Sequence, residues 1–323
     1  MILSFRRISA AAVALAGTLS LSSALTLAQT GDAPIRIGVG PVDTATPIFY
    51  AVKGGIYKKY GLNIELVKVP NGAATAAAMA GGSLDMGQAS PVAVMTAIIK
   101  GGLPLIVIGN LSSYVSEHPD YALLVAANSS IKTAKDLEGQ TLAAVSLKDQ
   151  NSLATFAWLD AQGVDRSKLK YVEIPASATL AAMEQNRVVA ATFYEPFFTA
   201  FMATGKVRVL GYPMDAIGKR FADSILFGSA KWVGEHPDAV NKFLRATQEA
   251  AVYVGAHESE TPQIAAEFTG VDPATVTNVR HGTRGVLLSP TDLQPMIDVL
   301  AKYEIIPKRV PAGDIICSCA LKR

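Results

Sequence analysis

The sequence predicts an α/β protein built as two lobes, and three observations lead to this prediction. Short apolar runs alternate with segments of helical composition along most of the chain, which is typical of strands and helices in α/β proteins. One long pattern of strands, helices and prolines occurs twice. The chain has 323 residues, half of them hydrophobic, so it can bury two moderate cores.

Residues 1–28 are interpreted as an export signal and are set aside from the fold. A pair of arginines precedes the apolar run 8–27, which Ser and Thr residues dilute. We expect cleavage after about Ala28, with Ala24 as an alternative. An uncleaved anchor and twin-arginine export are the other interpretations.

The repeated pattern covers residues 62–91 and 169–196. Each copy reads as a β-rich run, a proline, a loop of small residues, an Ala/Met helix, a second short strand and another proline that begins a helix. The two prolines lie 21 residues apart in both copies, and a shift of 105 residues superposes the copies. We infer a strand–helix–strand–helix–strand module that is used twice, with parallel strands in each copy.

The remaining elements follow from apolar runs and from helix starts with proline. In chain order we expect strands at 35–40 and 141–147, each followed by a helix, a crossing strand YALLVAA at 121–127, a returning strand at 224–233, and helices at 237–256, 261–268, 273–281 and 291–302.

The last part of the chain lacks the repeated pattern, so we assign it to the first lobe. The expected division is lobe 1 at 32–121 and 226–323, and lobe 2 at 122–225. Two passages between the lobes would make a hinge.

Candidate ligand-binding residues lie where strands lead into helices, because parallel sheets bind ligands at the carboxyl ends of their strands. Helix starts there carry partial positive charge and N–H groups that accept an anion, so opposed starts are expected to form a clamp. These junctions are rich in hydroxyls, amides and small residues. The candidates are Asp43, Thr44, Thr46, Asn71, Gln88, Ala89, Ser90, Tyr114, Gln150, Asn151, Ser152, Tyr194 and Glu195.

Some candidates also have a purely structural interpretation. Ser90 precedes Pro91 and can simply cap a helix, and Glu195 can do the same for the helix that follows it. Tyr194 suits stacking on a planar solute, whereas Tyr114 suits either stacking or hinge packing. A carboxylate from Glu195 in the cleft would favour a solute that carries an amine or a ring N–H.

Other classes of site find little support in the sequence. The net charge is +2 and the sequence has no dense run of Lys and Arg, so it does not predict a basic surface for binding nucleic acid. The four histidines are scattered, and no HExxH, GxSxG or P-loop motif occurs, so we expect no catalytic residues, metal or cofactor. A bridge between Cys317 and Cys319 would close a tight ring, so we expect no stabilising disulfide.

Four blocks, KGGIYKKYGLNIELVKVPNG, GGSLDMGQASP, IKTAKDLEGQTLAAV and FYEPFF, carry a family resemblance over about residues 34–250. They resemble periplasmic substrate-binding proteins of ABC importers for nitrate, taurine and alkanesulfonates, whose relatives bind the pyrimidine precursor of thiamine. The resemblance implies a two-lobed type II binding-protein fold. Each lobe is then a mostly parallel sheet flanked by helices, and two crossing strands join them.

The resemblance also implies which loops meet the solute. Residues 43–46 and 88–90 match the family's loops in one lobe, and residues 150–152 match the loop that faces them. At two positions near the expected solute, the sequence departs from the family's usual residues. Glu195-Pro196 stands where the family commonly has Asp-Pro, and Lys148-Asp149-Gln150 is more charged than the usual Gly-Ser.

The implied function is that of a monomeric periplasmic protein that captures a small sulfonate, taurine or nitrate-type solute by hinge closure. Its partners would be a permease and an ATPase at the inner membrane. The alternatives are a binding protein for a pyrimidine or another small nitrogen-containing ring, a pyrimidine-synthesising enzyme of the same fold, and a sensor module.

Overall fold

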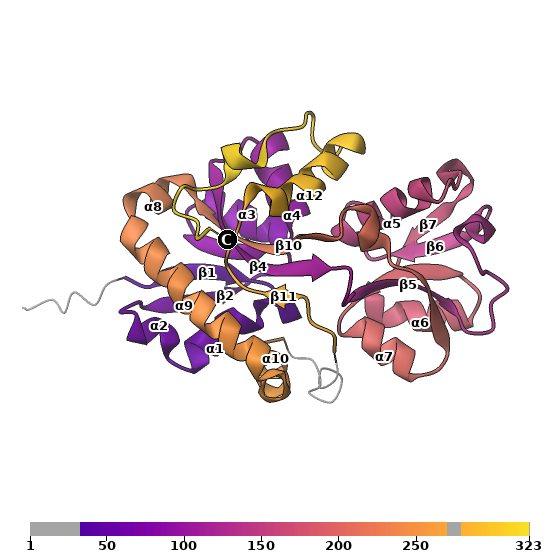
Figure 1. The fold of residues 1–323 in the computed structure, drawn as a ribbon, viewed down its shortest axis with the longest axis horizontal. Helices are drawn as coiled ribbons and strands as arrows, with labels where there is room; N and C mark the ends of the chain where they lie inside the picture. The colour runs from indigo at the N-terminus through magenta and orange to yellow at the C-terminus, as the bar shows by residue number, and fades with distance from the viewer. Residues whose placement is uncertain (1–32, 270–278, 323) are drawn as a thin grey trace, which may run out of the picture. The chain divides into compact units, whose positions relative to one another are not determined.

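A computed structural model of the chain describes residues 33–269 and 279–322 (Figure 1). The expected export signal at 1–28 and most of the expected helix at 273–281 lie outside these ranges. Within the described ranges, none of the helices combines the length and the apolar character that crossing a bilayer requires.

The described residues form two β-sheets covered by helices. The strands are β1 Ile35–Val39, β2 Ile64–Lys68, β3 Met86–Ala89, β4 Leu105–Val115, β5 Tyr121–Ala126, β6 Thr141–Ala144, β7 Lys170–Glu173, β8 Ala190–Tyr194, β9 Val207–Gly211, β10 Arg220–Ser229 and β11 Thr283–Arg284.

The α-helices are α1 Thr46–Lys53, α2 Ile56–Lys59, α3 Gly72–Ala80, α4 Pro91–Met95, α5 Gln150–Ala161, α6 Ala176–Glu184, α7 Phe197–Ala203, α8 Ala230–Glu235, α9 Pro237–Ala256, α10 Thr261–Thr269 and α12 Pro290–Lys302. The shorter helical turns are η1 Asp43–Ala45, η2 Thr96–Lys100, η3 Ala134–Leu137, η4 Arg166–Lys168, η5 Pro213–Ala216, η6 Glu258–Glu260 and η7 Ala312–Ile315.

The first sheet has the strand order β11-β4-β10-β3-β1-β2, and the second has the order β7-β6-β8-β5-β9. In the first sheet β1, β2, β3 and β4 share one direction, because β10 runs antiparallel to both β3 and β4. In the second sheet β6, β7, β8 and β9 share one direction, and β5 opposes them. Both sheets are therefore mostly parallel, as the alternating sequence pattern predicts.

The predicted repeat of the module is confirmed by these strands. The shift of 105 residues carries β1, β2 and β3 onto β6, β7 and β8 to within a few residues, and the parallel orders β2-β1-β3 and β7-β6-β8 match. The same shift carries α3 onto α6 and α4 onto α7.

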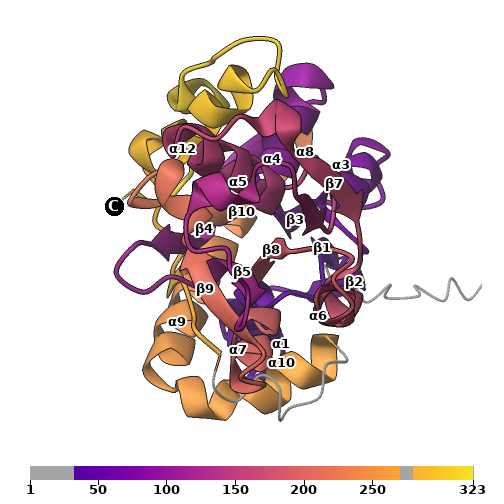
Figure 2. The ribbon, with the colours of Figure 1, turned by 90° about the vertical axis from the view of Figure 1, so that its right-hand side faces the viewer.

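Helices cover both faces of each sheet (Figures 1 and 2). On the first sheet, α1, α2, α9 and α10 pack on one face, and α3, α4 and α12 pack on the other. On the second sheet, α5 packs on one face, whereas α6 and α7 pack on the other. The apolar cores thus lie between the sheets and their helix layers.

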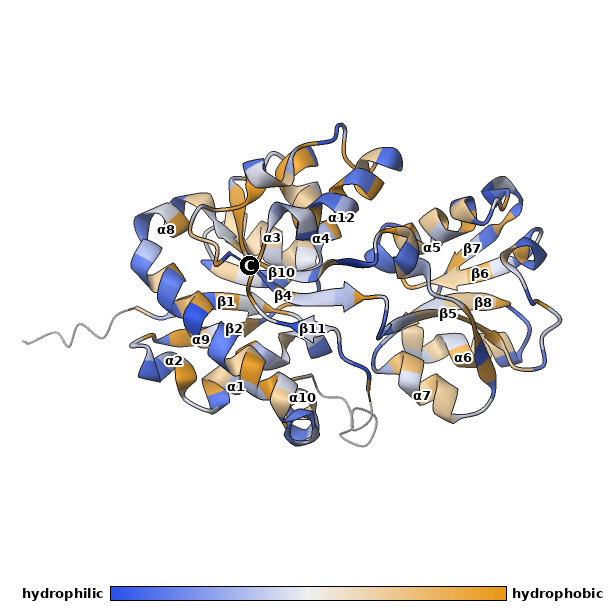
Figure 3. Cartoon of the chain, viewed as in Figure 1, coloured by the Kyte–Doolittle hydropathy of each residue, from blue (hydrophilic) through white to orange (hydrophobic). Residues whose placement is uncertain are grey.

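The longest helix, α9, illustrates how the sequence builds these layers. Pro237 starts it, because proline lacks the N–H that a first helical residue would leave unpaired. Val240, Phe243, Leu244 and Val254 recur at helical spacing and are wholly buried. Figure 3 shows hydrophilic and hydrophobic residues mixed along α9, as expected for a helix with one buried face.

The chain passes between the sheets twice, after β4 and before β10. The expected crossing strand at 121–127 is wrong in its role, because β5 pairs with β8 and β9 inside the second sheet. Its residues Ala122 to Val125 are wholly buried, which explains the continuous apolar run. The passage itself is the polar segment 116–120. The first sheet takes in β10 from Arg220, so the expected second lobe, 122–225, includes the first part of that strand.

The segment after α12 contains a disulfide. Cys317 and Cys319 form a disulfide across one intervening residue. The chain turns tightly at this point and brings the two Cα atoms to 5.0 Å, and the prediction that this pair gives no stabilising framework stays a prediction.

Candidate functional site

A cavity of about 220 Å³ lies where the carboxyl ends of β1 and β3 face those of β6 and β8. Its walls come from both sheets, at the edge where parallel strands are expected to bind ligands. The lining residues are Val42, Asp43, Thr44, Gln88, Ser90, Asp120, Tyr121, Asp149, Gln150, Asn151, Tyr194, Glu195, Asp223, Ser224 and Arg280.

Eight of the predicted site residues line this cavity. Four lie at or after the carboxyl ends of strands of the first sheet, and four lie at or after those of the second. They are Asp43, Thr44, Gln88 and Ser90 from the first sheet, and Gln150, Asn151, Tyr194 and Glu195 from the second. The loops that the repeated module places in corresponding positions therefore meet across one cavity.

Two other predicted residues are packed in the core instead. Tyr114 is wholly buried, donates its hydroxyl hydrogen to Asp215 Oδ1 at 2.9 Å and contacts the ring of Phe221. Its structural interpretation holds, and it is not part of the cavity wall. Ala89 lies in β3 under α3, where a Cβ added to Gly72 would come within 2.6 Å of the Cβ of Ala89.

Three more predicted residues serve helix starts near the cavity. Thr46 is buried and donates its hydroxyl hydrogen to the carbonyl oxygen of Asp43 at 2.7 Å. Asn71 is exposed and its side chain caps α3. Ser152 donates its hydroxyl hydrogen to the carbonyl oxygen of Ser146 at 2.6 Å, and lies away from the cavity wall. None of the three side chains lines the cavity.

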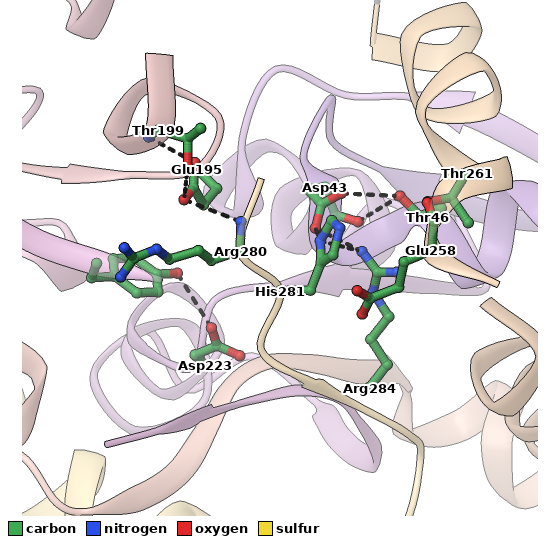
Figure 4. Close-up of polar contacts among 11 residues, drawn as sticks. Asp43, Thr46, Glu195, Thr199, Asp223, Glu258, Thr261, Arg280, His281 and Arg284 are labelled. Carbon is green, nitrogen blue, oxygen red and sulfur yellow. Dashed lines mark hydrogen bonds and ion pairs between the residues drawn. The ribbon is translucent and has the colours of Figure 1, made fainter. Parts of the chain in front are cut away.

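Asp43 is held by two basic side chains from the segment before and within β11 (Figure 4). Its Oδ2 lies 2.9 Å from Nδ1 of His281 and accepts a hydrogen bond from Nη2 of Arg284 at 2.9 Å. Burial would raise the pKa of Asp43, but the charge of Arg284 and the hydrogen bonds of both partners lower it to about 2. Asp43 is therefore a charged anchor for this segment.

Glu195 joins the second sheet to the segment that precedes β11 (Figure 4). Its carboxylate accepts hydrogen bonds from the backbone N and the hydroxyl of Thr199, at 3.1 and 2.7 Å. It also accepts from the backbone N of Arg280 at 3.2 Å, and the Arg280 guanidinium lies 4.8 Å from the ring centroid of Phe198. Burial raises the pKa of Glu195, and these hydrogen bonds oppose the rise.

At the starts of α5 and α7, amides that were expected to meet an anion are already bonded to carboxylates of the protein. Asp149 accepts a hydrogen bond from the N–H of Ser152 at 2.8 Å and so caps α5. Glu195 accepts from the N–H of Thr199 at the start of α7. A carboxylate of the protein thus occupies each position that an anionic head group was expected to take. The amides remain favourable for negative charge, but the chain supplies that charge itself.

The matching helix start on the first sheet is capped by a neutral group. The hydroxyl of Ser90 accepts from the N–H of Ala93 at 3.4 Å, and Pro91 has no N–H to offer. Ser90 therefore caps α4 and also lines the cavity. Nearby, Nε2 of Gln88 donates to the hydroxyl of Ser224 at 2.7 Å, which links β3 to β10.

The sequence interpretation missed seven residues of the wall. They are Val42, Asp120, Tyr121, Asp149, Asp223, Ser224 and Arg280. Five of them lie outside the repeated motif: Asp120 and Tyr121 where the chain enters β5, Asp223 and Ser224 within β10, and Arg280 before β11. One signal was available, because the FADSILF segment carries two polar residues inside an otherwise apolar strand.

The missed residues include a pair of buried carboxylates. Asp120 and Asp223 are 6% and 3% exposed. Burial raises the pKa of Asp120 well above its usual value, and the nearby charge of Asp223 raises it further. Burial raises the pKa of Asp223 to about 6, although hydrogen bonds from Ser112 and Tyr121 oppose the shift. The two groups titrate as a unit and do not both ionise readily.

The sequence is similar to one protein family and to several binding proteins. The family model described as "NMT1/THI5 like" matches residues 43–261. A protein of Escherichia coli (strain K12), provisionally named as an aliphatic sulfonates-binding protein, is 23% identical over 316 residues, which cover 92% of this chain and 93% of that protein. A provisionally named binding protein of Brucella suis is 25% identical over 83% of this chain and 82% of its own length.

Solved structures share the architecture. The periplasmic aliphatic sulphonate binding protein SsuA from Escherichia coli has a TM-score of 0.75 and 20% identity, covering 90% of this chain and 94% of its own. The periplasmic nitrate-binding protein NrtA from Synechocystis PCC 6803 has a TM-score of 0.70 and 16% identity, covering 87% of this chain and 84% of its own. The expected periplasmic binding-protein fold is therefore confirmed.

Proposed function

The chain belongs to the NMT1/THI5-like family, and on this premise we propose that it is the solute-binding component of an ABC importer. The observation that supports the proposal most directly is the cavity itself. Residues 88 and 90 of the first sheet and residues 150 and 151 of the second line one space of about 220 Å³. A small solute there would touch both halves of the protein at once.

The proposed mechanism is closure of two lobes around the solute. The lobes are the parts built on the first and second sheets, and the two passages next to β4 and β10 would act as the hinge. A solute that contacts both lobes favours the closed state, and it shifts the equilibrium only by its higher affinity for that state. The bond between Arg280 N and Glu195 Oε1 is the kind of contact that closure would form.

The proposed location is the periplasm, with residues 1–28 as the removed export signal. The relatives named above are binding proteins, and two of the solved structures are described as periplasmic, which supports this location for the chain. A membrane permease would recognise the closed monomer, and an ATPase on the far side of the membrane would drive transport.

We propose a binding protein rather than an enzyme. The relatives reported above carry binding-protein names. In the described wall no histidine or cysteine lines the cavity, and the nearest basic pair, His281 and Arg284, is committed to Asp43. A sulfonate, taurine or nitrate-type solute follows from the relatives' names, whereas a nitrogen-containing ring follows from the carboxylates and tyrosines of the wall.

Closure can be tested in solution. Thermal shift against sulfonates, taurine, nitrate, pyrimidines and small amines should identify a stabilising solute, since stabilisation grows with the logarithm of ligand excess. Small-angle scattering with that solute at saturation should show a smaller radius of gyration. Stabilisation without any compaction would contradict the hinge mechanism.

A further inference from the structure

The wall of the cavity carries an excess of negative charge. Among the described residues that line it, Arg280 is the one arginine or lysine, and its guanidinium lies against the ring of Phe198. The lining carboxylates are Asp43, Asp120, Asp149, Glu195 and Asp223. Asp43 is neutralised by Arg284, and the carboxylates of Asp149 and Glu195 cap helices. Asp120 and Asp223 have no such basic partner in the described structure.

Asp120 lies in the passage after β4 and Asp223 lies in β10, and the two carboxylates are close enough for their charges to interact. Asp120 directly precedes β5, and Asp223 interrupts the pairing of β10 with β4, where Ala222 faces Ser113 and Ser224 faces Ser112. Such a bulge re-aims the side chain of the extra residue. The hydroxyl of Tyr121 donates to Oδ2 of Asp223 at 3.3 Å, and this bond fixes the carboxylate.

One oxygen of each carboxylate has no hydrogen-bond partner. Oδ1 of Asp120 and Oδ1 of Asp223 are both buried and unpaired, and so is the amide oxygen Oε1 of Gln150 at the start of α5. All three residues line the cavity and are more than nine-tenths buried. A buried acceptor without a donor is costly, and native structures normally satisfy it. The three oxygens belong to wall residues that come from both sheets and from the passage between them.

Aromatic rings complete this end of the cavity. Tyr121 and Tyr194 both line it, and their ring centroids are 6.3 Å apart at an angle of 40°. The faces of such rings attract a positive charge that has been removed from water. Carboxylates, an amide oxygen and tyrosine rings are together the groups that recognise an organic cation rich in N–H donors.

We propose that the solute is a small organic cation, an alkylammonium or amidinium-type compound, whose charged nitrogen group binds between Asp120, Asp223 and Gln150. This inference rests on the proposed solute-binding function and names the chemistry of that same cavity. Two or more N–H donors on the solute would satisfy the unpaired oxygens, and its charge would offset the repulsion within the carboxylate pair. An anionic head group would meet those carboxylates and the capped starts of α5 and α7 instead.

The test compares solutes that share a body and differ in charge. Calorimetry of the mature chain with butylammonium, methylguanidinium and benzamidinium chlorides should give saturable binding, whereas butanesulfonate and nitrate should give none. Asp120→Asn and Asp223→Asn should each weaken cation binding roughly tenfold to a hundredfold, as expected for the loss of a charge-assisted hydrogen bond. Asp238→Asn, an exposed residue at the start of α9, is the matched control and should bind as the wild type does.

Folding of the variants is checked by their thermal stability without solute, which should equal or exceed that of the wild type because a buried like-charge repulsion is removed. The wild type gives a second readout. Cation binding near pH 6 should release protons, measured as a dependence of the binding heat on buffer ionisation enthalpy, because the bound cation favours the ionised carboxylates.

The outcomes separate this inference from the function on which it rests. If butanesulfonate binds and compacts the protein while the cations do nothing, the solute-binding function stands and the cationic class is overturned. If the cations bind and the radius of gyration does not decrease, the cation site is supported and the hinge mechanism is contradicted. Absence of binding by every cation at millimolar concentration overturns the inference, as does unchanged cation affinity in both aspartate variants.

Discussion

Arg284 donates a hydrogen bond from Nη2 to Oδ2 of Asp43 at 2.9 Å, and so ties β11 to the first loop of the cavity. The Arg284 side chain is 3% exposed, which makes this a buried ion pair between segments that are distant in sequence. Removing one partner of such a pair leaves an uncompensated charge away from water.

Arg284→Met should therefore lower the free energy of unfolding by about 3 kcal/mol. Arg309→Met is the matched control, because Arg309 pairs with Asp298 at the surface and its loss should cost less than about 1 kcal/mol. Urea denaturation of both variants measures the difference. Equal losses would contradict the structural role assigned to Arg284, and adding Asp43→Asn to Arg284→Met should restore part of the stability.

The carboxylate pair predicts an unusual pH dependence of the solute-free protein. The pKa of Asp223 is about 6 in the folded state, above its ordinary value, so the folded state binds more protons than the unfolded state between these values. The free energy of unfolding should then fall as pH rises from about 4 to about 7, by up to about 3 kcal/mol. The other acidic groups near the pair are Asp43 and Glu195. The pKa of Asp43 is lowered, so its ionisation makes the free energy of unfolding rise with pH, but only below about pH 4.

Chemical denaturation across this pH range measures the effect. Asp223→Asn should reduce the decline, since the variant has no carboxyl to ionise at that position, and the raised pKa values of Asp120 and Glu195 would account for the remainder. A wild-type profile that rises steadily with pH over the same interval would contradict the burial of an unpaired carboxylate pair.

Bulky substitutions in the wall should abolish solute binding, with a loss of stability of about 1 kcal/mol where the cap of Ser90 is removed. Ser90 and Asn151 line the cavity from opposite sheets, so Ser90→Leu and Asn151→Leu would place side-chain atoms in the space of the solute. Ser83→Leu, in an exposed turn before β3, is the control and should leave affinity unchanged. Calorimetry measures the affinity of each variant for the solute found in the thermal screen. Wild-type affinity in both wall variants would contradict the assignment of the site.

Glu195 is expected to govern closure more than solute chemistry. Glu195→Gln keeps the shape of the side chain but weakens its hydrogen bonds to Thr199 and to Arg280 N, and should cost roughly 1 kcal/mol as a helix cap. With solute at saturation, scattering of Glu195→Gln should show a larger radius of gyration than the wild type, because the contact with Arg280 N that closure would form is weakened. Thr199→Val, which removes only the hydroxyl donor, should cause a smaller change, and identical scattering of Glu195→Gln and wild type would contradict the role in closure.

Much of the fold was predictable because it depends on local patterns. The spacing of prolines and of small-residue loops identified the repeated module, and alternation of strand and helix identified the parallel sheets. The site loops followed from the rule that ligands lie at the carboxyl ends of strands. Asp43, Gln88 and Asn151 reached the cavity for that reason.

The rest depended on tertiary pairing that no local pattern records. Asp223 reaches the cavity because β10 is bulged against β4, and the register of two strands more than a hundred residues apart cannot be read from either strand alone. Asp120 lies in a passage between the sheets, and the composition of such a segment does not show where its side chains point. The helix cap of Glu195 was among the expectations and that of Asp149 was not, and the consequence of both caps for an anion required the bond partners.

The bulge in β10 also affects how the specificity of this protein could be engineered. Asp223 belongs to a central strand of the first sheet, whereas the loops after β1, β3, β6 and β8 are surface connections. Grafting those loops from a sulfonate-binding relative would leave the strand carboxylate in place. A chimera made in this way would carry the loop contacts of the sulfonate-binding relative, but the carboxylate of Asp223 would still repel a sulfonate. Removing this repulsion would require a change in the register of β10.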